Sequence, residues 1–173
     1  MRLTPPPKGT LSTPAPTVNP PRPVRVALIG CGKTKRPGRH PARELYTGPL
    51  FTAALAHAER TADEVFILSA LHGLLPLRTE VDSYDRTLAK ASKRERDAWA
   101  MRVGIELRRR MAGRKFEVQI YAGRMYVDPL WTHLRLFHHD LVISTPLEGL
   151  SIGYQLQWLR AAAANAGGAH GSR

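Results

Sequence analysis

The chain has 173 residues, 43% of them hydrophobic, and this length favours a single folded domain with one core. It has neither a run of about eighteen apolar residues nor an apolar N-terminal stretch, so we expect no membrane span and no secretory signal. These features predict a cytoplasmic location, and the single cysteine, Cys31, excludes an internal disulfide and a cysteine-built zinc site.

The charge of the chain is strongly basic. Its 26 lysines and arginines outnumber 14 acidic residues, which gives a formal net charge of +12. Residues 85–115 alone hold eleven bases and four acids. Because such a stretch attracts polyanions, we expect nucleic acid as a partner, DNA more than RNA, with the arginines at 108–110 among the contacts. The alternative is a solvated helix face that binds nothing.

The two ends of the chain differ from its centre in composition. Residues 1–23 contain eight prolines, no acid and hardly any large apolar residue, so we expect a disordered, proline-rich arm. Glycines after residue 163 predict a disordered tail over 164–173. A single domain is therefore expected over residues 24–163.

Short β-rich runs alternate with longer helical patterns in this central part. The runs are residues 24–30, 64–70, 116–123 and 140–146, and the helical patterns are residues 49–60, 92–111, 129–137 and 152–163. In the second helical pattern Trp99, Val103, Leu107 and Met111 recur every four residues and form an apolar stripe. This alternation predicts a three-layer α/β fold, with a short, mostly parallel sheet of about four strands and helices on both faces.

Ligands of such folds bind beyond the carboxyl ends of the strands, where the connecting loops gather. The first run ends in "GCGKTK", in which Gly30 and Gly32 flank Cys31, and Lys33 and Lys35 follow. Consecutive backbone N–H groups in a glycine-bounded turn bind anions, and lysine adds a positive charge. The alternative is a tight turn whose lysines face water. We expect Cys31 to be a packing residue and not a nucleophile.

The second run is followed by candidates for proton transfer. His72 lies beside a glycine and has a side chain that titrates near neutrality, although a lone histidine also serves as a structural residue. Asp82 and Asp85 belong to a local group of acids in this basic chain, and their alternative role is that of turn or cap residues. We take these three as the candidate catalytic residues.

Further candidates follow the other runs. Aromatic rings stack on bases, although they also fill cores, and glycines and basic residues accommodate phosphate. These phosphate- or nucleotide-binding candidates are Tyr46, Tyr84, Gly123, Arg124, Tyr126, Glu148 and Gly149. We expect Lys33 or Lys35 to share a cleft with at least one catalytic candidate, and Tyr46 or Tyr126 to lie on its wall.

Six motifs of the chain occur together in a known family. "CGKTK", "ELYTGPLF", "LSALHGLL", "SYDRTL", "AGRMY" and "PLEGLSIGYQLQWL" resemble those of a bacterial and phage family classed as a domain of unknown function. The resemblance covers residues 24–159. The chain is also remotely similar to the YaaA peroxide-stress proteins and to uracil-DNA-glycosylase-like α/β domains, which place the loop after the first strand near a flipped base. Because the "His-Pro-Ser" loop of the uracil glycosylases is missing, their catalytic residues are not transferred.

The leading hypothesis for function is an enzyme that acts on nucleic acid or a nucleotide, with hydrolysis of the N-glycosidic bond of a modified base as its reaction. No cofactor and no metal is required. Two alternatives are a noncatalytic nucleic-acid-binding module and an enzyme or sensor that binds small nucleotides. Under the leading hypothesis Cys31→Ala retains activity, whereas Asp82→Asn or Asp85→Asn abolishes it.

Overall fold

The computed structural model describes residues 22–137 and 140–167. The arm expected at residues 1–23 lies outside this range except for its last two residues, and residues 168–173 of the expected tail lie outside it as well. Helix α5 (Ile152–Gly167) extends past residue 163, where we expected the domain to end, and reaches the last residue that the structure describes.

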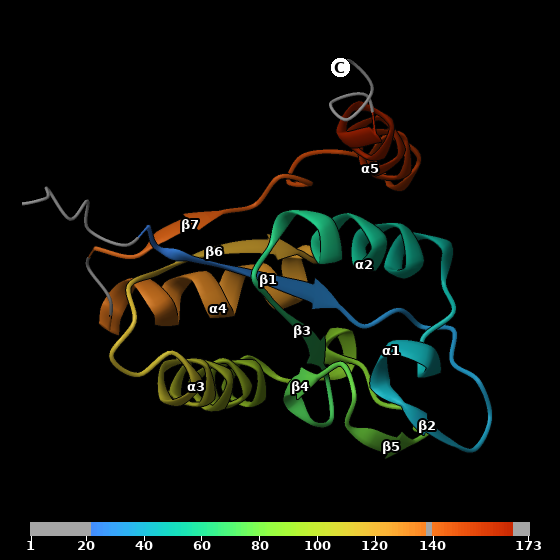
Figure 1. Cartoon of the computed structure of the whole chain (residues 1–173). Coiled ribbons are helices and arrows are strands. Elements are labelled where there is room, and N and C mark those ends of the chain that lie inside the picture. Colours follow the sequence, from blue (N-terminus) through green and yellow to red (C-terminus); the bar gives the residue numbers. More distant parts are fainter. Residues whose placement is uncertain (1–21, 138–139, 168–173) are drawn as a thin grey trace, which may run out of the picture.

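Five strands form the central sheet (Figure 1). They are β1 (Val24–Gly30), β3 (Glu64–Ser69), β4 (Gly73–Pro76), β6 (Phe116–Tyr121) and β7 (Val142–Ser144), in the spatial order β4-β3-β1-β6-β7. β4 is antiparallel to β3, and the other neighbours are parallel. The expected α/β class with a mostly parallel sheet is confirmed, with five strands in place of about four.

The additional strand, β4, forms a hairpin with β3. Gly73 has a φ of 74°, a left-handed conformation that glycine adopts without strain, and the chain reverses there to pair Ser69 with Gly73 and Phe66 with Pro76. Proline cannot donate to a strand ladder, so "GLLP" is a weak strand signal. Pro76 is tolerated because it ends an edge strand.

Strand β1 lies at the centre of the sheet and is buried on both faces. Val26 and Leu28 pack into a core cluster on one face, Ala27 and Ile29 into a cluster on the other, and all four are 0% exposed. Successive side chains of a strand point to opposite faces, so a central parallel strand has an uninterrupted apolar run. This is the pattern that identified β1 in the sequence.

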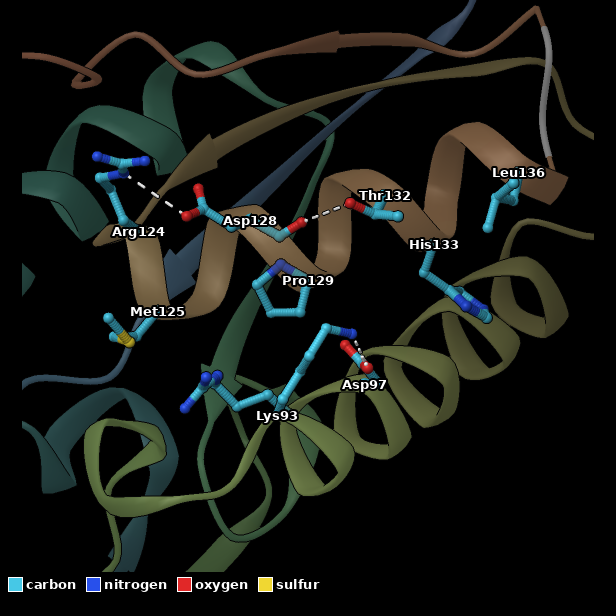
Figure 2. Close-up of a pocket in the computed structure, with 10 residues that line it drawn as sticks. Lys93, Asp97, Arg124, Met125, Asp128, Pro129, Thr132, His133 and Leu136 are labelled. Atoms are coloured by element: carbon cyan, nitrogen blue, oxygen red, sulfur yellow. Dashed lines mark hydrogen bonds and ion pairs between the residues drawn. The ribbon is translucent and has the colours of Figure 1, made fainter.

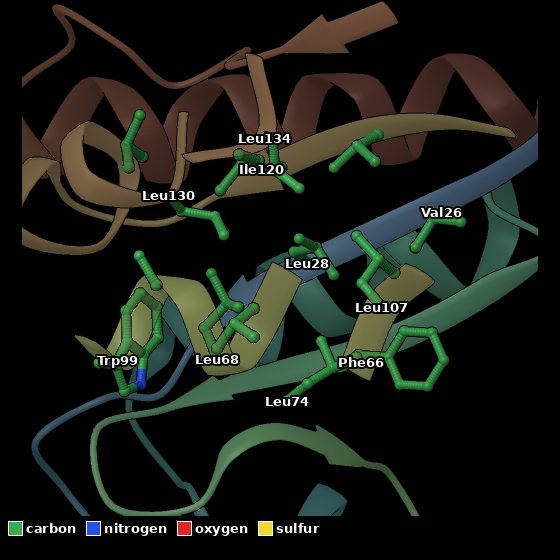
Figure 3. Packing of buried hydrophobic residues seen from close by; sticks show 14 of the residues in the cluster. Val26, Leu28, Phe66, Leu68, Leu74, Trp99, Leu107, Ile120, Leu130 and Leu134 are labelled. Carbon is green, nitrogen blue, oxygen red and sulfur yellow. The ribbon is translucent and has the colours of Figure 1, made fainter. Parts of the chain in front are cut away.

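Helices cover both faces of the sheet (Figure 1). α2 (Pro49–Thr61) packs with α5 on one face, and α3 (Lys93–Arg110) packs with α4 (Arg124–Phe137) on the other. The predicted stripe on α3 is buried in the core under the sheet, where Figure 3 shows Leu107 near Leu28 and Trp99 near Leu68. Within the described ranges, no helix combines the length and the apolar character needed to cross a membrane.

Helix α4 begins earlier than expected. The pattern predicted a helix over residues 129–137, because proline is favoured in the first turn. The helix begins at Arg124, and the carbonyl of Gly123 accepts hydrogen bonds from the N–H groups of Tyr126 (2.9 Å) and Val127 (3.2 Å). Pro129 therefore lies inside the helix. Arg124 and Tyr126, expected in a loop, are in its first turn.

A small second sheet and two short helical segments were not predicted. β2 (Arg39–Pro41) pairs antiparallel with β5 (Glu80–Asp82), and α1 (Ala42–Leu45) and the 3₁₀ segment η1 (Leu88–Lys90) lie in the long connections. Each of these elements has only three or four residues. Segments this short carry no hydrophobic period, so their sequence gives no signal.

His57 on α2 is a buried histidine that makes the fold sensitive to acid. Its Nε2 lies 3.2 Å from the Tyr121 hydroxyl, whose own proton is donated to Gln119, and its Nδ1 is buried without a partner among the described residues. A second proton would go to Nδ1. Burial, and secondarily the charge of Arg60, lowers the pKa of His57.

We therefore expect acid to destabilise the protein through His57. The unfolded state, with a histidine pKa of about 6.5, binds the proton first, so stability falls as the pH drops below this value. In urea unfolding between neutral pH and mildly acidic pH, His57→Leu should flatten this slope. An unchanged slope in His57→Leu would show that another group controls it.

Candidate functional site

The candidate site lies where the strand order of the parallel sheet reverses. β1 has β3 on one side and β6 on the other, and the crevice beyond the carboxyl ends of such strands is the usual ligand site of α/β sheets. A cavity of about 110 Å³ lies there, which we call the switch-point pocket. Its lining includes Gly30, Cys31 and Gly32 after β1, Phe51 on α2, and Gly123 and Tyr126 at the start of α4.

Two helices begin at the switch-point pocket. Leu50 and Phe51 belong to the first turn of α2, and Tyr126 belongs to the first turn of α4. The N-cap residue of α2 is Gly48, and no side chain caps this helix. N-terminal N–H groups and the positive end of the helix dipole favour anions, so the pocket suits a negatively charged group.

The two glycines of "GCGKTK" matter because they have no side chain, and not because they adopt unusual backbone angles. Neither has a positive φ, and the Cys31 N–H donates to the carbonyl of Leu68 (3.1 Å), so this N–H group is not available to an anion. A Cβ at Gly30 would lie 3.0 Å from the Cβ of Ala122, whereas one at Gly32 would be 3.8 Å from its nearest neighbour. Gly30 thus permits close approach of the strand ends, and Gly32 keeps the pocket open.

A group of hydroxyls surrounds Cys31, and we call it the tyrosine cluster: Cys31, Tyr46, Ser69, Tyr84 and Tyr126. The Cys31 sulfur lies 3.2 Å from the Tyr126 hydroxyl and 3.7 Å from that of Tyr84. The Tyr84 hydroxyl is 2.9 Å from the Tyr46 hydroxyl and 2.8 Å from the Ser69 hydroxyl. These side chains come from five separate segments, and sequence reasoning missed Ser69, although its position at the end of β3 is a signal.

The phenols of the cluster stay protonated at physiological pH. Burial is the largest cause, and it raises the pKa of Tyr46, Tyr84 and Tyr126 above the ordinary tyrosine value, with a further increase from the neighbouring Cys31. The cluster therefore offers neutral hydroxyl groups. Such groups donate and accept hydrogen bonds but do not act as bases.

Two of the predicted residues meet at Tyr84. The Lys35 Nζ lies 4.5 Å from the centre of the Tyr84 ring and 5.8 Å from that of Tyr46. The His72 ring contacts the Tyr84 ring edge-on at 5.4 Å, and the His72 N–H donates to Ser69 (3.0 Å). Lys35 and His72 thus both contact the tyrosine cluster, at its Tyr84 side, but neither of them lines the switch-point pocket, whose wall includes Tyr126.

The carboxylates lie farther out. Asp82 is exposed on β5 and pairs across the small sheet with Arg39 at 3.7 Å, and Asp85 is exposed directly after Tyr84. Among the described residues that line the switch-point pocket, none is a carboxylate. Lys33 is also exposed.

Three further candidates do not line the pocket. Arg124 is exposed and pairs with Asp128 at 3.6 Å, and Glu148 accepts a hydrogen bond from Thr145 beside another hollow of about 290 Å³. Gly149 has a φ of 75° and serves the turn before α5. In the parts of the chain that the structure describes, no group of three or more histidine, cysteine or acidic side chains is arranged to hold a metal ion.

Residues 26–161 match the profile of a protein family described as a family of unknown function, DUF6884. The match covers the whole sheet apart from the first two residues of β1. No curated protein and no solved structure matches the chain significantly.

Proposed function

The chain belongs to DUF6884, a family of unknown function, and we propose that it is an enzyme that binds a nucleotide, free or within nucleic acid, at the switch-point pocket and hydrolyses its N-glycosidic bond. The observation that carries the proposal is the pocket itself. It lies at the reversal of the strand order and between the N-termini of two helices, and two of its lining residues, Cys31 and Tyr126, belong to the tyrosine cluster that Lys35 contacts. This is a setting for an anionic ligand with an aromatic part.

The size of the pocket limits what enters it. A volume of 110 Å³ is the space of about four water molecules, well below that of the pockets that enclose whole ligands. One group of a nucleotide, a base or a phosphate, fills it, and the rest of the nucleotide lies outside. Both a free nucleotide and a nucleotide within a polymer can place one group in the pocket and keep the rest outside.

The tyrosine cluster supplies the polar groups for the reaction. Hydrolysis adds water across the bond between the sugar and the base: the hydroxyl of water joins the sugar carbon, and the proton goes to the base nitrogen. Neutral phenols such as Tyr84 and Tyr126 stabilise the leaving base by donating hydrogen bonds. The remote similarity to uracil-DNA-glycosylase-like domains motivates this reaction.

A carboxylate is needed to orient the water or to stabilise positive charge on the sugar. We assign this role to Asp85 and not to Asp82. Asp85 directly follows Tyr84, a member of the cluster, whereas Asp82 is bound to Arg39 on the small sheet. Being exposed, Asp85 would meet the part of the nucleotide that projects from the pocket.

Filling the pocket tests the proposal. A Cβ at Gly32 would be in ordinary contact with Phe51, so Gly32→Val places its methyl groups in the pocket without forcing the backbone. We expect Gly32→Val to weaken binding of nucleoside monophosphates at least about tenfold, in calorimetry, because steric exclusion removes most of the contact. Gly153→Val, at an exposed site on α5, is the matched control and should bind as the parent does. Equal affinities in all three proteins would refute the site.

A further inference from the structure

A second concave surface lies between α3 and α4, on the opposite side of the first turn of α4 from the pocket. A hollow of about 600 Å³ and an adjoining one of about 650 Å³ share Lys93, Asp97 and His133, and together we call them the α3–α4 groove. Figure 2 shows Lys93 and Asp97 rising from α3 towards Pro129 and His133 of α4. The proposed reaction uses none of these residues.

Cations dominate the polar lining of the groove. Four basic residues line it (Lys93, Arg94, Arg96 and Arg124) against two carboxylates (Asp97 and Asp128). Each carboxylate already pairs with a cation of the groove, Asp97 with Lys93 and Asp128 with Arg124. The positive charge in excess is that of Arg94, which is exposed, and of Arg96, whose guanidinium also donates to the carbonyl of Ala91.

Three of these cations occupy an unfavourable position in their helix. Ser92 caps α3, since its hydroxyl accepts from the Glu95 N–H and the Glu95 carboxylate accepts from the Ser92 N–H, so Lys93, Arg94 and Arg96 lie in the first turn. The positive end of a helix dipole disfavours cations. Basic residues that break a local rule in this way indicate a function beyond folding.

The floor of the groove is apolar and open to solvent. Met101 and Met125 are each 47% exposed, Leu136 is 65% exposed, and Pro129 lies between the two helices. Large apolar side chains gathered beside cations mark an interaction surface. Single-stranded nucleic acid has the matching chemistry, because its bases present apolar faces and its phosphates are anions. In a duplex the base faces are stacked inside and cannot reach such a floor.

A second copy of the chain is a poorer occupant. Each copy carries a formal net charge of +12, and the groove itself is basic, so two copies repel one another. Nucleic acid has the opposite charge.

We propose that the α3–α4 groove binds single-stranded nucleic acid and leads it to the switch-point pocket. Arg124 and Met125 line the groove, while their neighbours Gly123 and Tyr126 line the pocket. The two surfaces thus lie on different sides of one helical turn, whose diameter with side chains is about 10 Å. The role of the groove as a path to the pocket rests on the proposed function, whereas binding in the groove does not.

This proposal moves the expected polyanion contact from residues 108–110 to the first turn of α3. Arg109 and Arg110 both pair with Glu106, at 2.9 and 2.8 Å, and Arg110 also lies over the Phe66 ring at 5.5 Å. Consecutive helical residues point about 100° apart, so the three arginines do not form one patch. None of them lines the groove.

The test is a titration of the full-length chain with a labelled single-stranded DNA oligonucleotide of mixed sequence, over a series of salt concentrations. Lys93→Glu/Arg94→Glu should weaken binding about tenfold or more and lower the dependence of log Kd on log salt by about two. The matched control, Arg78→Glu/Arg102→Glu, removes the same charge at exposed positions outside the groove and should weaken binding far less. Asp97→Asn, which frees Lys93, should tighten it.

Several outcomes would overturn the groove proposal. One is equal weakening in the two double variants, which would mean that net charge alone attracts DNA. Another is a failure of the parent protein to bind single-stranded DNA. A third is binding of duplex DNA, polyglutamate or anionic vesicles with the same affinity as the single strand. Binding of nucleoside monophosphates separates the two proposals. If Lys93→Glu/Arg94→Glu binds them as tightly as the parent does and only Gly32→Val loses this binding, the result supports the pocket and not the groove. If Gly32→Val changes nothing while the double variant loses DNA, the groove stands without the pocket.

Discussion

Trp99→Ala is expected to lower the free energy of unfolding by about 3–5 kcal/mol, the usual cost of removing a large buried aromatic side chain. Trp99 is 1% exposed and lies in the core between α3 and the sheet (Figure 3). Its Nε1–H donates to the carbonyl of Ser69 at 2.8 Å, and its ring contacts Tyr126 edge-on at 5.4 Å. The expected loss of stability therefore has two causes, a cavity in the core and an unpaired carbonyl of Ser69.

Trp99→Phe separates these two contributions. It keeps much of the apolar volume but removes the N–H donor, so we expect a smaller loss, of about 1–3 kcal/mol. Urea unfolding measures both variants. Because Ser69 and Tyr126 belong to the tyrosine cluster, Trp99→Ala should also weaken nucleotide binding under conditions where the variant is fully folded. A loss below about 1 kcal/mol in Trp99→Ala would show that the indole is not the anchor described here.

The layers of the fold were predictable because they depend on local patterns. The apolar run of β1 and the four-residue recurrence of Trp99, Val103 and Leu107 each lie within one element, and burial of that element follows from its period. The same holds for the start of α3, where Ser92 and Glu95 form a capping box. These features decide which side of each element faces the core.

The elements that escaped prediction depend on other parts of the chain. β4 exists because Gly73 reverses the chain onto β3, and β2 and β5 are only three residues long and pair across about forty residues of sequence. α4 begins before Pro129 because packing on α3 compensates for the missing N–H. In each case a tertiary contact overrides a local preference.

The site was predictable in part for the same reason. Gly30, Gly32 and Tyr126 gather because the carboxyl ends of parallel strands meet at one edge of a sheet. Asp82 does not join them, since the unpredicted small sheet holds it beside Arg39. The partners of Cys31 were also not predictable, because Tyr84 and Tyr126 are brought to the sulfur from distant segments.

Asp85→Asn is expected to reduce N-glycosidic hydrolysis roughly 10²–10⁴-fold, the usual contribution of a positioned acid or base. The substitution keeps the shape of the side chain and removes its charge, and Asp85 is exposed, so stability should change little. The assay incubates DNA that carries modified bases with the protein and measures abasic sites by alkaline strand cleavage. Nucleotide binding, measured separately, should persist in the variant, because the pocket lining is intact.

Asp82→Asn and Cys31→Ala are the matched controls for this experiment. Asp82 is an exposed carboxylate three residues away that pairs with Arg39, so its variant should keep activity. Cys31→Ala removes a thiol that accepts a hydrogen bond from Tyr84, and it too should remain active if water and not sulfur attacks the sugar. If Cys31→Ala is inactive while both aspartate variants are active, the thiol is the nucleophile. In that case the neutral phenols of Tyr84 and Tyr126 are the groups that stabilise its thiolate.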